Sequence, residues 1–199
     1  MLKNYFKTAF RSLIKNKVHS FINVAGLSAG MVVTILIGLW IWDELSFDKY
    51  HQNYNSVAEV MQHQTLNGEI KTQAAVPIPL GNELRTTYGN QFKHLVMSSR
   101  TEGHILAAGQ NKIVRTGNYM QAEAPSLFAL KILEGSGNGL NDPSSILLSR
   151  STAKILFGNA GPVNKVLRFD DNVDLKVAGV YEDLPRNTTL HDLLFIVPW

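Results

Sequence analysis

The chain contains no cysteine among its 199 residues. A disulfide framework, a cysteine-ligated metal and thiol chemistry are therefore excluded, and any domain must be held together by packing and hydrogen bonds. Negative charge is also missing from one part of the sequence, because no acidic residue precedes Asp43. The first 17 positions hold five of the 19 lysines and arginines, so the charge of the chain is distributed unevenly along its length.

Common catalytic patterns are missing as well. The histidines show no His-x-x-x-His or His-Glu pairing of the kind that holds zinc. No serine lies in a Gly-x-Ser-x-Gly elbow. The glycine-rich loop at residues 135–139 is not followed by the Lys-Ser or Lys-Thr that binds phosphate and magnesium. The sequence therefore predicts a protein that is not an enzyme and holds no metal or cofactor of its own.

An uncharged and mostly apolar run extends from Phe21 to Trp42. About 22 helical residues cross a hydrocarbon core of about 30 Å. A cleaved signal peptide is a poorer interpretation, because the run exceeds the usual apolar region of about 7–15 residues and its exit at 39–42 is bulky. We predict a transmembrane helix over residues 18–43, with Trp40 and Trp42 at the outer membrane surface.

The charges on either side of this run predict its orientation. The cations before it are Lys3, Lys7, Arg11, Lys15 and Lys17, and the acids after it are Asp43, Glu44 and Asp48. By the positive-inside rule the amino terminus is cytoplasmic and the chain after residue 43 lies on the opposite side of the membrane. The remaining sequence holds 14 basic against 16 acidic residues, which removes the charge argument for a nucleic-acid partner.

Residues 1–17 have the pattern of a basic amphipathic helix. Apolar residues recur with helical spacing, and the cations listed above occupy the rest of the helical wheel. The apolar positions are Leu2, Tyr5, Phe6, Phe10, Leu13 and Ile14. We expect this helix to lie in the cytoplasmic headgroup layer with its cations toward anionic membrane lipid. The alternative is a stop-transfer flank without defined structure.

The external part, residues 44–199, has the pattern of an α+β domain. The Asn67-Gly68 pair predicts a two-residue hairpin between strands at 56–65 and 70–76. Pro79 fits the first turn of a helix that runs to Tyr88. Further strands are expected at 92–100, 104–108 and 112–117. The segment from Asp43 to His51 is expected to continue the membrane helix and to break near 53–55.

The second half of this domain has clearer local signals. A short helix is expected at 126–130, a glycine-rich turn at 134–141 and a strand at 146–148. Ser149 can cap a helix over 150–157, which Gly158 would end. A hairpin is expected to join strands at 165–169 and 175–181 across residues 170–172.

Several segments carry a resemblance to a known family. Residues 4–27 and the acidic and aromatic segment 43–51 are similar to the start of MacB-like and FtsX-like permease subunits of ABC transporters. Residues 145–149, 153–158 and 177–185 resemble the MacB-type periplasmic core domain. Two departures are visible. Asn164 stands where the family usually has glycine, and the loop from Pro185 to His191 replaces a Pro-x-Asn-Ser-His pattern.

The resemblance implies a permease subunit that couples ATP hydrolysis to movement of its periplasmic domain and to export or extraction of a substrate. ATP would be bound by a separate cytoplasmic ABC ATPase subunit, and a second permease subunit would complete a homodimer or heterodimer. The amphipathic helix would form the inner coupling element. The periplasmic coupling segment would comprise Asp43, Glu44, Phe47, Asp48 and Tyr50.

Family members have at least four transmembrane helices, so the sequence resembles an amino-terminal part of such a permease. On this interpretation the strand that closes the sheet would come after Trp199, and an unpaired sheet edge would remain. The alternative function is a single-span, membrane-anchored binding or sensor module. The 20 or so residues before the span leave no room for an output domain of a sensor.

Overall fold

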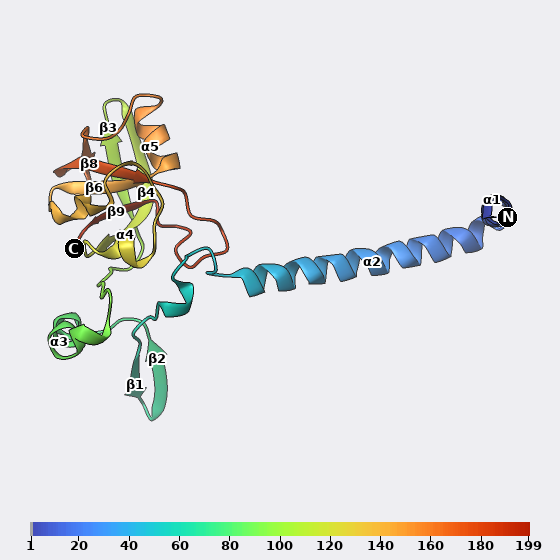
Figure 1. Ribbon diagram of the computed structural model, residues 1–199, viewed down its shortest axis with the longest axis horizontal. Coiled ribbons are helices and arrows are strands. Elements are labelled where there is room, and N and C mark those ends of the chain that lie inside the picture. The colour runs from blue at the N-terminus through green and yellow to red at the C-terminus, as the bar shows by residue number, and fades with distance from the viewer. Residues whose placement is uncertain (1) are drawn as a thin grey trace. The chain divides into compact units, whose positions relative to one another are not determined.

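The computed structural model describes residues 2–199, without the side chains of Leu2, Lys3 and Ala9 (Figure 1). The chain divides into two compact units, Met1–Ser46 and Phe47–Trp199. The mixture of helices and strands confirms the predicted α+β class.

The first unit consists of two helices. Helix α1 covers Leu2–Lys15 and α2 covers Lys17–Ser46, a length of 30 residues. At their junction the Ser20 hydroxyl donates to the carbonyl oxygen of Leu13 at 3.0 Å. By length and composition α2 could cross a membrane, and none of its residues is buried. The two helices expected from the sequence are therefore present, while their placement in a membrane stays a prediction.

The helix predicted to continue as far as His51 is shorter, because α2 ends at Ser46. Residues 47–50 form a turn, in which Asp48 has a φ of +58°. A residue in this left-handed conformation cannot continue a right-handed helix. The Asp48 N–H instead donates to the carbonyl oxygen of Asn187 at 2.9 Å, and the expectation of a longer helix was wrong.

A small two-stranded sheet and a helix follow the turn (Figure 1). After the 3₁₀ helix η1 (Tyr54–Ser56), the elements are β1 (Gln62–Leu66), β2 (Glu69–Gln73), α3 (Pro79–Tyr88) and the 3₁₀ helix η2 (Gly89–Gln91). Asn67 and Gly68 both have positive φ, as the predicted two-residue turn requires. The predicted bounds of α3 are confirmed, whereas the first strand starts only at Gln62. We call residues 57–95 the small lobe.

Residues 96–199 form the sheet domain. Its strands are β3 (Glu102–Ala108), β4 (Asn111–Met120), β5 (Ile132–Gly135), β6 (Ser145–Ser149), β7 (Val166–Phe169), β8 (Val173–Tyr181) and β9 (Phe195–Pro198). Their order is β5-β8-β6-β9-β4-β3-β7, and β7 also pairs with β8. The pairings β8-β6-β9-β4-β3-β7 therefore close into a ring, and β5 pairs with the last residues of β8, beyond the part that pairs with β7.

Alternate residues of the same strand enter two different cores, as the two-residue period of a strand requires. Ile146 and Leu148 belong to a core that includes Ala153 and Leu156 of helix α5 (Arg150–Phe157). Leu147 between them belongs to the other core, which lies against α4 (Ala124–Leu127) and the 3₁₀ helix η3 (Gly137–Asn141). The all-apolar strand β6 is thus buried on both faces.

Two predicted local structures in this domain are confirmed. The Ser149 hydroxyl accepts a hydrogen bond from the Thr152 N–H at 3.3 Å and caps α5, which ends before Gly158 with its φ of +62°. The β7–β8 hairpin turns across residues 170–172, where Asp170 and Asp171 both have positive φ. Local side-chain chemistry is sufficient to specify both structures.

Three expectations about strands were wrong. Residues 92–100 do not form a strand, and only Ser98 makes an isolated bridge, to Met120. Strand β5 occupies the start of the expected glycine-rich turn. No strand was expected near the end of the sequence, yet β9 lies between β6 and β4. Residues 195–198 therefore join β6 to β4 within the sheet, while β5 pairs with β8 alone among the described strands.

Candidate functional site

The carboxylate of Asp48, two residues beyond the end of α2, is bound by the loop that precedes β9. Its Oδ1 accepts hydrogen bonds from the Thr188 hydroxyl at 2.6 Å and from the Thr189 N–H at 2.8 Å. Its Oδ2 accepts from the Thr189 hydroxyl at 2.7 Å. Together with the bond from its own N–H to Asn187, these contacts attach the turn after α2 to a segment about 140 residues later.

His51 contacts the same loop through Thr188. Its ring is almost fully buried, with 6% exposure, and lies between Phe128 and Thr188. Nδ1 is 3.0 Å from the carbonyl oxygen of Phe128, and Nε2 is 3.1 Å from the Thr188 hydroxyl oxygen. We call Asp48, His51, Thr188 and Thr189 the exit cluster.

The Thr188 hydroxyl connects His51 to Asp48. A carbonyl oxygen only accepts, so Nδ1 of His51 donates to Phe128. On the other side of the ring, Nε2 lies beside the Thr188 hydroxyl oxygen, and the same hydroxyl donates to the Asp48 carboxylate. A chain of polar contacts therefore runs from Phe128 through His51 and Thr188 to Asp48.

The pKa of Asp48 reflects opposing effects. Partial burial of the carboxyl raises its pKa, but the hydrogen bonds from Thr188 and Thr189 and the charge of His51 lower it. The net result is a pKa below the ordinary value for aspartate. Asp48 is therefore ionised at neutral pH, and its hydrogen bonds are charge-assisted.

Two neighbouring contacts extend this attachment. The Tyr50 hydroxyl donates to Oε2 of Glu182 at 3.4 Å, and Oε1 of Glu182 forms an ion pair with Lys131 Nζ at 3.2 Å. Burial, followed by the charge and hydrogen bond of Glu182, raises the pKa of Tyr50, so the phenol keeps its proton. The Asn53 side-chain amide donates to the carbonyl oxygen of Leu127 at 3.3 Å.

Comparison with known proteins identifies the family. The family described as MacB-like periplasmic core domain matches residues 20–199. The chain belongs to this family. The predicted resemblance is thereby confirmed, and a membrane-length helix followed by a MacB-like periplasmic core domain fits a protein of the inner membrane. No curated protein matches the chain.

Two solved structures are similar to the MacB-like domain at low identity. The periplasmic region of MacB from Actinobacillus actinomycetemcomitans is 19% identical with a TM-score of 0.49, and the match covers 62% of this chain and 55% of that one. The extracellular domain of the noncanonic ABC-type transporter YknZ from Gram-positive bacteria is 20% identical with a TM-score of 0.45, covering 59% of each chain. The chain thus spans little more than half the length of these structures.

The predicted periplasmic coupling segment is divided between the two units of this MacB-like protein. Asp48 and Tyr50 contact the sheet domain, as described above. Phe47 is 45% exposed. Asp43 and Glu44 belong to α2 and are exposed, with the Asp43 carbonyl oxygen accepting from the Ser46 hydroxyl at 2.9 Å.

The predicted membrane-interface residues lie on α1 and are exposed to its surroundings. The exposed apolar side chains are Tyr5, Phe6, Phe10, Leu13 and Ile14. The exposed cations are Lys7, Arg11 and Lys15 on α1 and Lys17 at the start of α2. The side chains of Leu2 and Lys3 lie outside the described residues. A role in membrane binding stays a prediction for all of them.

Sequence reasoning did not single out His51, Thr188 or Thr189. His51 lies in the acidic and aromatic segment 43–51, which carries part of the resemblance, but no contact was predicted for its ring. The loop from Pro185 to His191 is notable in the sequence only for its departure from the family pattern. That loop supplies the hydroxyl groups that bind Asp48. No local spacing could reveal a contact between residues so far apart in the sequence.

A second polar pair lies across β3 and the β7–β8 hairpin. Asp170 Oδ2 is 2.6 Å from Nδ1 of His104, and Oδ1 accepts from the Ile105 N–H at 2.9 Å. The His104 ring stacks on Phe169 with centroids 4.9 Å apart. Burial raises the pKa of Asp170, but the hydrogen bonds from His104 and Ile105 and the charge of His104 lower it below the ordinary value.

Neither polar cluster provides the donor set of a metal site. Within residues 2–199 as described, no group of three or more histidine, aspartate or glutamate side chains could hold a metal ion. The exit cluster uses its hydrogen bonds to join backbone segments.

Proposed function

We propose that this chain is a permease subunit of an ABC transporter. It would couple ATP hydrolysis on a separate cytoplasmic subunit to movement of the periplasmic core domain, and so to export or extraction of a substrate. Membership of the MacB-like family supports this function. The observation that carries it is the exit cluster, which attaches the residues immediately after α2 to the interior of the sheet domain.

The route from the exit cluster into the sheet is short. Thr188 is fully buried, and the chain after it enters β9 at Phe195. Just before this strand, the Leu194 N–H donates to the Thr116 carbonyl oxygen at 3.0 Å, and the Leu194 carbonyl oxygen accepts from the Ser149 N–H at 2.9 Å. A displacement of Asp48 would therefore be transmitted to strands in the middle of a closely packed sheet.

The amino-terminal helix would supply the contact on the other side of the membrane. Its exposed apolar and basic side chains suit the boundary between acyl chains and anionic headgroups. We place this helix in the cytoplasm, next to the ATPase subunit that binds ATP, and the chain after residue 43 in the periplasm. A second permease subunit would complete the transporter, and no nucleic acid is involved.

The test uses the full chain purified from its native host together with any ATPase that accompanies it. Because the chain has no cysteine, Arg186→Cys, at an exposed position next to the exit cluster, gives a single site for maleimide labelling. We expect ATP with vanadate to change the labelling rate several-fold. Asp48→Asn should abolish this response.

Asp174→Asn is the matched control, because Asp174 makes an exposed ion pair with Arg168 that contributes little to stability. It should retain the full response to ATP. Absence of any accompanying ATPase, or a labelling rate insensitive to ATP in the wild-type complex, would refute the transporter function. The membrane-anchored binding module would then be the better interpretation.

A further inference from the structure

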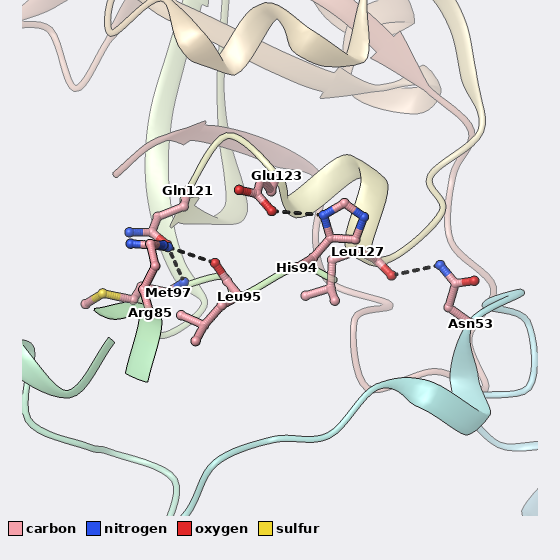
Figure 2. A network of polar contacts seen from close by, with 8 residues as sticks. All are labelled: Asn53, Arg85, His94, Leu95, Met97, Gln121, Glu123 and Leu127. Atoms are coloured by element: carbon pink, nitrogen blue, oxygen red, sulfur yellow. Dashed lines mark hydrogen bonds and ion pairs between the residues drawn. The ribbon is translucent and has the colours of Figure 1, made fainter. Parts of the chain in front are cut away.

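The small lobe meets the sheet domain through a few polar contacts, which Figure 2 shows from close by. We call Arg85, His94, Met97, Gln121 and Glu123 the lobe joint. We propose that the small lobe swings on the sheet domain as a hinged element, and that the side-chain oxygen of Gln121 holds it in the position seen here.

Gln121 is the central acceptor of the joint. Its Oε1 accepts from Arg85 Nη2 at 2.8 Å and from the Met97 N–H at 3.1 Å (Figure 2). The same Nη2 of Arg85 donates to the carbonyl oxygen of Leu95 at 3.0 Å. Arg85 belongs to α3 in the small lobe, and Gln121 follows β4 in the sheet domain. The carboxamide oxygen of Gln121, which follows β4, thus holds both α3, through Arg85, and the segment that leads out of the small lobe, through Met97.

The other polar contacts are exposed and weak. Nδ1 of His94 lies 2.9 Å from Oε2 of Glu123, and these side chains are 23% and 53% exposed. Ion pairs in such surroundings contribute about 0–1 kcal/mol. Asn53 donates to Leu127 just before the lobe begins, so this bond marks one pivot and does not restrain the lobe itself.

Apolar packing across the joint is limited to one face of α3. Gly81 and Arg85 are four residues apart and therefore lie on the same side of the helix. A Cβ atom at Gly81 would collide with the side chain of Met97, so the helix rests directly on Met97. Gly81 is the only buried residue within the described range 57–95.

Several apolar side chains of the lobe are exposed, including Leu66 at 49%, Ile70 at 74% and Ile78 at 65%. An interface between parts of one chain resists relative motion only when it is large and hydrophobic. The lobe joint is neither, so motion of the lobe costs little. If Arg85 moves away, Gln121 keeps its bond to Met97 and stays oriented, so the contact can form again without rearrangement of the sheet domain.

The test measures the distance between spin labels on the full chain in detergent micelles. Lys71→Cys lies on β2 and Lys154→Cys on α5, both exposed, and no native cysteine competes for the label. We expect one main distance in the wild-type background. Gln121→Ala and, separately, Arg85→Ala should each broaden the distribution at least about twofold.

Gln110→Ala is the matched control, because it makes the same change at an exposed turn of the sheet domain. It should leave the distribution unchanged. A label pair within the sheet domain, Asn172→Cys with Lys154→Cys, should keep its distance in every variant and so verify folding. Equal widths in wild type, Gln121→Ala and Arg85→Ala would refute the hinge. The measurement needs neither an ATPase nor a substrate, so its outcome is independent of the proposed function.

Discussion

Thr188→Val is expected to destabilise the sheet domain far more than the loss of one hydroxyl from a surface loop would. Valine keeps the shape of the buried side chain but removes the oxygen that joins Asp48 and His51. The neighbouring Thr189→Val removes a hydroxyl that contacts only the exposed side of the same carboxylate. The two substitutions therefore form a matched pair.

The magnitude follows from the groups left without partners. A hydrogen bond to a charged group contributes about 1.5–3 kcal/mol, and a buried donor left unsatisfied costs about 1–3 kcal/mol. Thr188→Val loses the bond to Asp48 and leaves His51 without its Thr188 partner. Thr189 still donates twice to Asp48, so the carboxylate is not left without partners and the total cost is less than the sum of the two. We expect about 3 kcal/mol in total. Thr189→Val should cost about 1 kcal/mol.

Differential scanning calorimetry of the full chain in detergent can measure this difference. For a domain of about 150 residues, 1 kcal/mol corresponds to roughly 2–4 °C in Tm. We therefore expect Thr188→Val to lower Tm by about 6–12 °C and Thr189→Val by about 2–4 °C. Equal shifts for the two variants would refute the conclusion that the Thr188 hydroxyl bridges Asp48 and the His51 ring.

Other perturbations have equally definite outcomes. The folded-state pKa of Asp170 is lowered, so its stabilising contribution is complete above the ordinary aspartate pKa of about 4 and is lost as pH falls through the folded pKa. Asp170→Asn should therefore reduce the fall in Tm measured below about pH 4. Gly117→Ala would bring a Cβ within 2.6 Å of the Phe195 ring and should lower the free energy of unfolding by at least about 2 kcal/mol. Gly89→Ala is the control, because the space around Gly89 is open and the substitution should be tolerated. A spin label at Phe10 should be more accessible to oxygen than to a water-soluble nickel complex, with the reverse on the opposite face of α1; equal accessibilities would contradict membrane binding by this helix.

The elements predicted well from the sequence are those specified by neighbouring residues. The Asn67-Gly68 turn needs two positive φ angles, which these residues tolerate. Pro79 has a fixed φ suited to the first turn of α3, and Ser149 caps α5 with its own hydroxyl. Each of these signals acts within about four residues, so no knowledge of the tertiary structure is needed.

The elements that were missed depend on partners distant in the sequence. Strand β9 is only four residues long and is stabilised by β4 and β6, which lie far from it in the sequence. The segment 92–100 is expected to be a strand, but its backbone is bound in part by the Gln121 side chain, and a ladder does not form. His51 resembles an isolated surface histidine until Thr188 and Phe128 are brought to it by the fold.

The place of β9 between β6 and β4 also dictates when this part of the sheet can close during synthesis. A ribosome delivers β3 to β8 first, and these can pair only as an open sheet with β4 and β6 at its edges. Backbone groups at Asn118–Met120 and Leu147–Leu148 stay without their strand partners until residues 195–198 emerge. Such late, long-range pairing is slow and leaves strand edges available for aggregation. The edges of β4 and β6 in the nascent sheet are therefore open to aggregation until β9 is made.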